Sequence, residues 1–527
     1  MEEEIRMKRE SSRWSSPRIA AVSALACGVL THLYALTNNV QNYDSITQQP
    51  YGYGTGVTSG RWLLNLLGDF FQFWGGDYNL PVMDVFLFLL ILAVSAGFLV
   101  STLGIKNGLS AALIGGVMAV FPTVTSTIFF HYTAVYYGLS AFFAVFAAWV
   151  LPRHKYGVLF SALATACSLG IYQAYVPVTI SVFVLVLIRD GLNQQRKPWD
   201  LIRQGLVDCL ALLLGLVLYY LFLKATLAYY GAELSNYQGM NSMGKISLGT
   251  LPGLIKEAIY SVVMLPVKDY CGLSGMRIIR LLYALLAGIS AVSLAYGLLV
   301  RVRKWSMAIL EAGMCILFLI AVNFIVIMCP DSWVYTLMVY SFTLLPCAPL
   351  VILQTLQNRE EGQENNKSIQ RLLYKLCAVC VALMVFCYGY EANIQYTMAD
   401  YVTHQTENYY NSLVTQIRMT EGFAPDKKWA LIGRVEDPLL RSSWQHEIRY
   451  GGMSDTVDLL NSYSRFAWIY NYIGYVPDIL SEEEMDELLE TEEVKAMPCW
   501  PSHGSIQVIG DLVVVKFQEA GKFQRLY

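Results

Sequence analysis

The sequence predicts an all-α polytopic membrane bundle followed by a small α/β domain, and three observations carry this prediction. Hydrophobic side chains make up 55% and charged side chains 15% of the 527 residues, a composition too apolar for a set of soluble domains. Apolar runs of about 18 residues or more recur, and each can cross a hydrocarbon core roughly 30 Å thick as a helix. The stretch after residue 390, in contrast, is polar.

About eleven apolar runs are predicted to be transmembrane helices. They are expected to be helical because lipid offers no partners to backbone N–H and C=O groups. The fifth and sixth runs are short, and one long helix broken around Tyr172, Gln173 and Tyr175 is an alternative interpretation of them. The runs are 19–37, 80–103, 109–130, 134–151, 157–172, 174–189, 205–229, 279–300, 306–329, 333–356 and 372–390.

The distribution of Lys and Arg predicts the orientation in the membrane. The N-terminus is polar and basic, and the apolar run after it is too long for a signal peptide and lacks a small-residue cleavage site, so we expect a retained anchor. Basic residues concentrate in the connections that lie inside if the N-terminus is cytoplasmic. We therefore expect a multi-span domain at 1–390 in the cell membrane and an extracytoplasmic domain at 391–527.

Two of the predicted outer segments have the composition of helices that lie on a membrane surface. Residues 61–75 combine apolar and aromatic side chains with few charges, and residues 251–270 place Lys256 and Lys268 beside an apolar stripe. Re-entrant or surface helices that only seal the bundle are the alternative for both segments.

The tail predicts a small domain with mixed secondary structure. A long polar helix continues from the last span, and KKWALIGRVE reads as a short strand. The run SEEEMDELLETEEVKAM predicts an acidic helix capped by Ser481, with Glu484 three residues on. SIQVIGDLVVVKFQ predicts a hairpin that turns at Gly510 and Asp511. The acidic run is interpreted as a solvated helix face, with a cation site as the less favoured alternative.

A polar loop between the first two apolar runs contains an acid, several glycines and an arginine. Asp44 follows the first span, where a rigid helix can position a carboxylate as a general base toward a hydroxyl group. A role as a turn residue explains Asp44 equally well. Arg61 has the guanidinium geometry that grips a phosphate, or it anchors a surface helix at the headgroups.

Other candidate residues lie at outer span ends or in outer loops, where polar groups are costly unless they face a wet cavity or the bundle. His131, Tyr172 and Gln173 stand at span ends, although packing explains the histidine and helix capping explains the other two. The cations Lys256, Lys268 and Arg277 come from the long outer loop before the eighth span.

Several classes of function are disfavoured by what the sequence lacks. A basic strip for nucleic acid is absent, and so are the GxSxG, HExxH and Walker A patterns. Cys377 and Cys380 have CxxC spacing, but they lie inside a predicted span without a second pair, so we expect no metal site there. The spans also show no obvious internal duplication of the kind common in transporters.

The order of a first span, NNVQNYDSI, and SGRW followed by an amphipathic run resembles the Gtr-type (type II) family of bacterial polytopic glucosyltransferases. SLGIYQAY, ALIGRV and MPCWPSHGSIQVIGDLVVVKF are also similar to that family. The resemblance implies a GT-C-like bundle with an essential acid in the first outer loop and a sugar donor linked to polyprenyl phosphate. Asp44 matches that acid, and Arg61 matches the arginine of the GR motif. Ser45 follows Asp44 where the broader GT-C pattern has a second acid, so we expect no obligatory metal and no other cofactor.

The resulting hypothesis is a membrane glycosyltransferase that moves a hexose, with glucose as the first choice, from polyprenyl phosphate to a cell-envelope glycan such as O-antigen on the outer face. Its expected partners are the lipid-linked sugar, the glycan acceptor and membrane lipid. Asp44 would be catalytic, and the other candidates would bind the donor or its phosphate. The alternative is a lipid-linked sugar flippase or transporter, which predicts polar residues through the depth of the spans.

Overall fold

The computed structural model describes residues 15–76, 78–193, 196–235, 247–301, 305–330, 333–357, 364–435, 440 and 446–519. These residues form two compact units. The larger, here called the membrane unit, comprises the described residues up to Asn39, together with Gly52–Asn393 and Glu447–Gly452. The sheet unit comprises Val40–Tyr51, Ile394–His446 and the described residues from Met453 onward. The basic residues of the first 14 positions lie outside the described residues.

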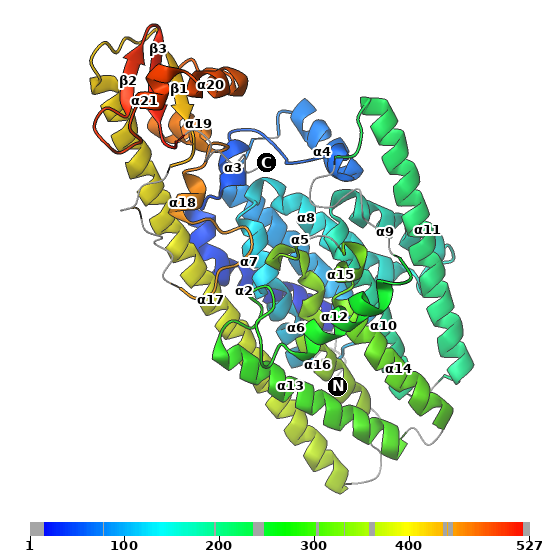
Figure 1. Ribbon diagram of the computed structural model, residues 1–527. Helices are drawn as coiled ribbons and strands as arrows, with labels where there is room; N and C mark the ends of the chain where they lie inside the picture. Colours follow the sequence, from blue (N-terminus) through cyan, green and yellow to red (C-terminus); the bar gives the residue numbers. More distant parts are fainter. Residues whose placement is uncertain are drawn as a thin grey trace, which may run out of the picture. The chain divides into compact units, whose positions relative to one another are not determined.

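The membrane unit is helical, and Figure 1 shows many of its helices running side by side. Its helices are α2 (Ser16–Thr37), α4 (Trp62–Phe73), α5 (Pro81–Thr102), α6 (Gly108–Val120), α7 (Pro122–Ile128), α8 (His131–Val150), α9 (Gly157–Ile171), α10 (Val176–Leu192), α11 (Pro198–Tyr230), α12 (Leu251–Val263), α13 (Arg277–Tyr296), α14 (Trp305–Val322), α15 (Ile325–Met328) and α16 (Leu344–Gln357). A 56-residue helix, α17 (Glu364–Met419), contributes to both units.

Nine helices within the described residues are long and apolar enough to cross a membrane, which fits a multi-pass membrane protein. The predicted count of eleven is not confirmed. The run at 157–172 forms the shorter helix α9, and the run at 333–356 forms two 3₁₀ turns before α16, which has only 14 residues. In that run the Thr336 hydroxyl bonds to the Cys271 carbonyl, so part of it serves loop contacts instead of a continuous helix.

Proline and glycine shape the helices at identifiable points. Pro122 begins α7 directly after Phe121, because a proline lacks the N–H that would continue α6. The run predicted at 109–130 therefore contains a break, but α6 and α7 together, Gly108–Ile128, are still long and apolar enough to cross a membrane as one span. α9 and α10 are two separate helices rather than one broken helix. The Ser140 hydroxyl of α8 donates to the Ser168 carbonyl of α9, and the Thr179 hydroxyl of α10 donates to the Ala144 carbonyl. The chain therefore turns back at Tyr172, which is extended.

The first span, α2, packs closely on α6. A Cβ at Gly115 of α6 would collide with the carbonyl of Ala20 in α2, so only glycine permits this approach of the two backbones. Near the other end of α2, His32 is fully buried and its Nε2 donates to the Ala119 carbonyl at 2.9 Å. The contact therefore combines close backbone packing with a buried hydrogen bond.

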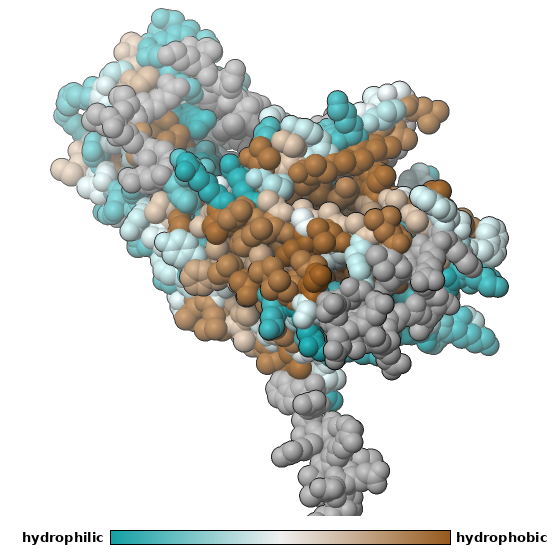
Figure 2. All heavy atoms as spheres, turned by 90° about the horizontal axis from the view of Figure 1, so that it is seen from below, coloured by the Kyte–Doolittle hydropathy of each residue, from teal (hydrophilic) through white to brown (hydrophobic). Residues whose placement is uncertain are grey.

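Much of the surface of the membrane unit is apolar. Leu206, Leu213 and Val217 of α11 and Leu281 and Val292 of α13 are all exposed. Figure 2 shows a broad apolar surface on one face of the molecule, bordered by hydrophilic side chains. Exposed aliphatic side chains along long helices are what contact with lipid tails requires.

The sheet unit contains a three-stranded sheet with the order β1-β3-β2. Its strands are β1 (Lys428–Ile432), β2 (Ile506–Ile509) and β3 (Leu512–Lys516), and its short helices are α3 (Tyr43–Thr47), α18 (Thr456–Leu459), α19 (Arg465–Trp468), α20 (Glu482–Leu489) and α21 (Glu492–Ala496). β1 and β3 pair in parallel, and β2 and β3 form an antiparallel hairpin. The predicted strand and the predicted hairpin turn at Gly510 and Asp511 are confirmed.

Both faces of this sheet are covered. Trp429 and Leu431 of β1 pack in one apolar cluster with Trp468 of α19, whereas Ala430 and Ile432 pack in a second cluster with Leu489 of α20. This distribution follows from the alternation of side chains along a strand.

The predicted acidic helix begins as expected, because Ser481 and Glu484 form a capping box. However, it is divided in two, since the Thr491 hydroxyl accepts the Val494 N–H and starts α21.

Candidate functional site

Arg61 follows a tight turn that is bound to α4. The turn needs glycine twice: Gly60 has a φ of 76°, and the Asn65 side chain occupies the place where a Cβ at Gly56 would lie. The Asn65 Oδ1 accepts the Val57 N–H at 3.3 Å. These contacts fix the backbone that leads into Arg61.

Two side chains from distant parts of the chain bind the carbonyls that precede Arg61. The Gln173 Nε2 donates to the Ser59 carbonyl at 3.2 Å and to the Tyr219 hydroxyl at 3.3 Å. The Tyr219 O–H donates to the Gly60 carbonyl at 3.0 Å. Gln173 is buried where the chain turns between α9 and α10, and Tyr219 belongs to α11. The arginine turn is therefore joined to α11 and to the 3₁₀ turn between α9 and α10.

The guanidinium of Arg61 lies beside two tyrosine rings. Its Nη1 donates to the Tyr137 hydroxyl at 3.2 Å, and its Cζ is 4.9 Å from the centroid of the Tyr172 ring. The two rings stack in parallel with their centroids 4.3 Å apart. An arginine over an aromatic face is attracted by the ring quadrupole, which adds to the hydrogen bond in fixing its orientation.

The structure thus brings together three of the predicted site residues, Arg61, Tyr172 and Gln173. Two further residues of this site, Tyr137 and Tyr219, were not predicted, because both lie within apolar runs. The only signal for them is the residue type, since a phenol in an apolar environment usually finds a hydrogen-bond partner.

His131 is the first residue of α8, and its ring is buried next to an acid. Its Nδ1 is 3.9 Å from the Asp84 carboxylate, which also accepts the Leu80 N–H at the start of α5. The His131 ring is 1% exposed, and neither ring nitrogen has a hydrogen-bond partner. The distance to Asp84 is too long for a hydrogen bond. The pair therefore has unused hydrogen-bonding capacity.

The three cations that were predicted in the long loop before α13 are exposed. Lys256 lies on α12, Lys268 lies in the loop after it, and Arg277 begins α13. The predicted convergence of these cations with Arg61 stays a prediction.

Other charged residues of the same loop have structural contacts. The Asp269 carboxylate accepts the N–H groups of Gly272 and Ser274, and the Arg280 Nε donates to the Ser274 carbonyl at 2.7 Å. These bonds give the loop a defined conformation.

Asp44 belongs to the sheet unit and lies on α3, whereas the sequence predicted a loop at this position. The reason is local: the Asn42 side chain accepts the Ser45 N–H and the Ser45 hydroxyl accepts the Asn42 N–H, a capping box that starts the helix. The side-chain cap of this turn is thus Asn42 rather than Asp44. Asp44 is partly exposed, and its backbone carbonyl accepts the Thr47 hydroxyl.

The segment that carries Asp44 is fastened within the sheet unit. The Thr47 hydroxyl donates to the Tyr463 hydroxyl at 3.1 Å, and the Gln41 Nε2 donates to the Tyr472 hydroxyl at 2.9 Å. Burial raises the pKa of Tyr472 to about 12. These hydrogen bonds restrict the backbone of the segment that carries Asp44.

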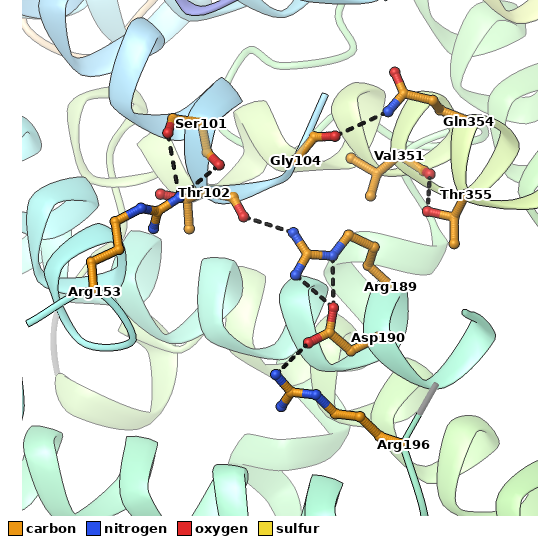
Figure 3. Close-up of polar contacts among 10 residues, drawn as sticks. All are labelled: Ser101, Thr102, Gly104, Arg153, Arg189, Asp190, Arg196, Val351, Gln354 and Thr355. Atoms are coloured by element: carbon orange, nitrogen blue, oxygen red, sulfur yellow. Dashed lines mark hydrogen bonds and ion pairs between the residues drawn. The ribbon is translucent and has the colours of Figure 1, made fainter. Parts of the chain in front are cut away.

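The end of the membrane unit opposite Arg61 is basic. Backbone carbonyls hold Arg153 and Arg189 there, and Arg196 pairs with the Asp190 carboxylate (Figure 3). Arg153 donates to the carbonyls of Trp149 and Ser101, and Arg189 donates to the Thr102 carbonyl at 2.7 Å. Arg189 also forms an ion pair with Asp190. Cations at the C-terminal ends of helices satisfy carbonyls that lack helical partners.

A family model for the glucosyl transferase GtrII matches residues 33–345, more than half of the chain. The chain belongs to the GtrII glucosyltransferase family. This confirms the predicted resemblance and supports a glycosyltransferase activity. The matched range includes Asp44, Arg61, His131, Tyr172 and Gln173, and it ends before the tail segments that were also similar. No curated protein and no solved structure matches the chain.

A metal site is not evident in the part of the chain that the structure describes, where no three His, Cys, Asp or Glu side chains gather in a way that holds an ion. The expectation of no obligatory metal stays a prediction.

Proposed function

We propose that this GtrII-family protein transfers glucose from polyprenyl phosphate to a hydroxyl group of a cell-envelope glycan on the outer face of the membrane. The observation that carries the proposal is the fixed position of Arg61 beside Tyr137 and Tyr172, inside the range that the family model matches. A guanidinium that is oriented before the substrate binds can stabilise a leaving phosphate without reorganisation during the reaction.

In the proposed reaction Asp44 accepts the proton of the acceptor hydroxyl, and the acceptor oxygen attacks the anomeric carbon from the side opposite the phosphate. The bond between the anomeric carbon and the phosphate oxygen breaks, and polyprenyl phosphate leaves with the electron pair. Arg61 binds that phosphate, and His131, Lys256, Lys268 and Arg277 are further candidates for holding its charge. Tyr172 and Gln173 bind the sugar or keep Arg61 in place. No metal takes part in this scheme.

The membrane location fits a donor with a lipid tail. A polyprenyl chain partitions into the hydrocarbon core, so its phosphate lies at the membrane boundary, where a multi-pass enzyme can bind it. The amphipathic helix α4 supports this picture, because its Trp62 and Leu64 are buried while Phe73 and the following Trp74 are exposed. Such a helix is suited to the interface between lipid and water.

The test of the proposed base is Asp44→Asn in the full-length protein, assayed for glucose transfer from glucosyl polyprenyl phosphate. We expect a loss of about 100-fold or more in kcat, because a general base contributes on that order. Asp511→Asn is the matched control, since Asp511 is fully exposed in the hairpin turn and has only a surface ion pair with Lys427. Wild-type kcat in Asp44→Asn would rule out Asp44 as the base.

One observation favours the alternative of a lipid-linked sugar transporter. Glu311 is fully buried inside α14, and neither of its carboxylate oxygens has a hydrogen-bond partner. Asp208 is also buried, in α11, and accepts a hydrogen bond from Gln204. Acids inside spans commonly mark ion or substrate pathways. However, Glu311 packs against Gly191, beside the Asp190 of the basic end, and not at the Arg61 end.

The two functions make different demands on the substrates. A transporter moves the lipid-linked sugar across the membrane of vesicles even when they contain no acceptor glycan. If the protein is a transporter, Glu311→Gln should slow that movement. The transferase consumes the donor only when an acceptor is present. Movement without acceptor, together with no transfer when the acceptor is added, would favour the transporter.

A further inference from the structure

A short segment of the tail belongs to the membrane unit. The residues Glu447–Gly452, here called the strap, are part of that unit, although the chain on either side of them belongs to the sheet unit. The strap lies beyond residue 345, where the family match ends. It therefore adds a piece from the unmatched part of the chain to the matched one.

Hydrogen bonds join the strap directly to two parts of the membrane unit and, through one of them, to a third. The Gly451 N–H donates to the Thr336 hydroxyl at 2.8 Å, and the Ser126 hydroxyl of α7 donates to the Gly451 carbonyl. The same Thr336 hydroxyl donates to the Cys271 carbonyl at 2.7 Å, in the loop before α13. The backbone of one strap residue, Gly451, thus bonds to α7 and to the 3₁₀ turn that begins at Thr336, and the Thr336 hydroxyl extends this link to that loop.

Close packing requires small residues on both sides of these bonds. A Cβ at Gly451 would lie 3.0 Å from the Thr336 backbone nitrogen, and Gly452 has a φ of 93° with the Phe130 ring where its Cβ would be. On the loop side, Tyr450 of the strap lies where a Cβ at Gly272 would be, at 2.7 Å. Substitutions at these glycines would push the strap away from its contacts.

The strap contacts two segments that carry proposed site residues. Phe130 is the residue before His131 and caps the start of α8. The loop that bonds through Cys271 also contains Lys268. Neither segment is a regular helix at the point of contact, so these tertiary bonds help to restrict its conformation.

We propose that the strap is a positioning element that holds the start of α8 and the loop before α13 in the arrangement that binds the donor phosphate. This inference rests on the proposed function, because it assigns His131 and Lys268 to the donor. Without the strap, the side chains of the site would still be present but would no longer be held close together. This should weaken donor binding more than it changes the chemical step.

The reactivity of the Cys271 thiol shows whether the strap is bound, independently of activity. Its Sγ donates to the Val334 carbonyl at 3.2 Å, and burial raises its pKa to about 12. A thiol with a raised pKa reacts slowly with maleimides, since the thiolate is the nucleophile. Loss of the strap should expose this thiol and speed its labelling.

The experiment compares two strap variants of the full-length protein with wild type. Gly451→Val forces a branched side chain against the Thr336 backbone, and Thr336→Val removes the bridging hydroxyl with little change in shape. Gly288→Val in α13 is the matched control, because no atom lies within 4 Å of a Cβ there. The readouts are the labelling rate of Cys271 by mass spectrometry, with the fully buried Cys347 as the marker of global unfolding, and the KM and kcat for glucosyl polyprenyl phosphate.

We expect maleimide to label Cys271 faster in both strap variants than in wild type. We also expect the donor KM to rise by about fivefold or more, the equilibrium effect of one lost hydrogen bond, with kcat less affected. Cys347 and the Gly288→Val control should stay at wild-type values. Thr336→Val decides the question if Gly451→Val does not fold. Slow labelling in the folded variants, or fast labelling with a wild-type KM, would overturn the positioning role. Absence of transfer by the wild-type protein would instead overturn the proposed function, while the labelling still shows whether the strap holds the loop.

Discussion

The two ends of the membrane unit both contain arginines, but they use them differently. At the basic end, Arg153 and Arg189 donate to backbone carbonyls at the last turns of helices, and Asp190 neutralises part of their charge. At the other end, the guanidinium of Arg61 contacts the phenol of Tyr137 and the ring of Tyr172. The first arrangement completes helices, whereas the second orients a cation by means of aromatic rings.

The partners of a charged side chain therefore indicate its role better than its position in the sequence does. In the sequence, arginines at both ends stand next to apolar runs and differ only in the predicted side of the membrane. In the structure, the carbonyl contacts explain Arg153 and Arg189 by stability alone. The aromatic contacts of Arg61 fit a cation that is held ready for a phosphate.

The largest expected effect comes from exchanging the arginines of the two ends for alanine. Arg61→Ala should lower kcat for glucose transfer by about 100-fold, since removal of one preorganised donor from a charge that develops in the transition state costs this much. Arg153→Ala should leave the kcat of the folded protein unchanged and lower its thermal stability. The measurement is the transfer rate per folded molecule, with the folded fraction taken from thermal unfolding in detergent. Equal losses of kcat in the two variants would break the comparison.

A smaller effect is expected from the packing of the basic end. Gly191→Ala places a methyl group where the Glu311 carboxylate lies, and overpacking of this kind costs roughly 1–3 kcal/mol of the free energy of unfolding. Gly205→Ala is the control, because its nearest neighbour, a methyl group of Leu187, would be at an ordinary distance of 3.6 Å. Denaturant unfolding in detergent measures both. An unchanged midpoint in Gly191→Ala would show that Glu311 can move aside freely.

The smallest effect concerns the support of Arg61. Tyr219→Phe removes the hydroxyl that donates to the Gly60 carbonyl and should lower transfer a few-fold, which corresponds to about 1 kcal/mol for one hydrogen bond. Tyr220→Phe, at the next position, is the control, since Tyr220 is exposed and contacts Lys224 through its ring face. Initial rates at saturating donor separate the two variants. A wild-type rate in Tyr219→Phe would mean that Gln173 alone positions the turn.

The sequence predicted most helices well, because long apolar runs have few alternatives in a membrane. It failed where short-range chemistry competes with a long run. Pro122 interrupts the helix inside one predicted span, although the span as a whole is confirmed, and Thr491 starts a new helix inside the acidic run. The proline and the capping threonine are both visible in the sequence, but the longer run around each of them predicts one continuous helix. The 3₁₀ turns at 336–343 have a different cause, since Thr336 bonds to residues far away in sequence.

The site was predicted in part. Arg61 was recognised in the polar loop after the first span, and Tyr172 and Gln173 at a span end, and the three residues meet in the structure. The tyrosines that complete this site, Tyr137 and Tyr219, come from the middle of apolar runs. Only the packing of α8, α9 and α11 brings them to the Arg61 turn, and such long-range packing has no local signal in a single sequence.

The close approach of Gly115 to Ala20 has a consequence for how the protein is made. The ribosome releases α2 first, yet the helix that its backbone touches, α6, is synthesised third among the long apolar segments. During that interval the leading segment lies in the bilayer without the close backbone contact that Gly115 permits. Its buried His32 likewise lacks the Ala119 carbonyl until then. A chain truncated between the two segments should therefore hold α2 less firmly than the complete protein does.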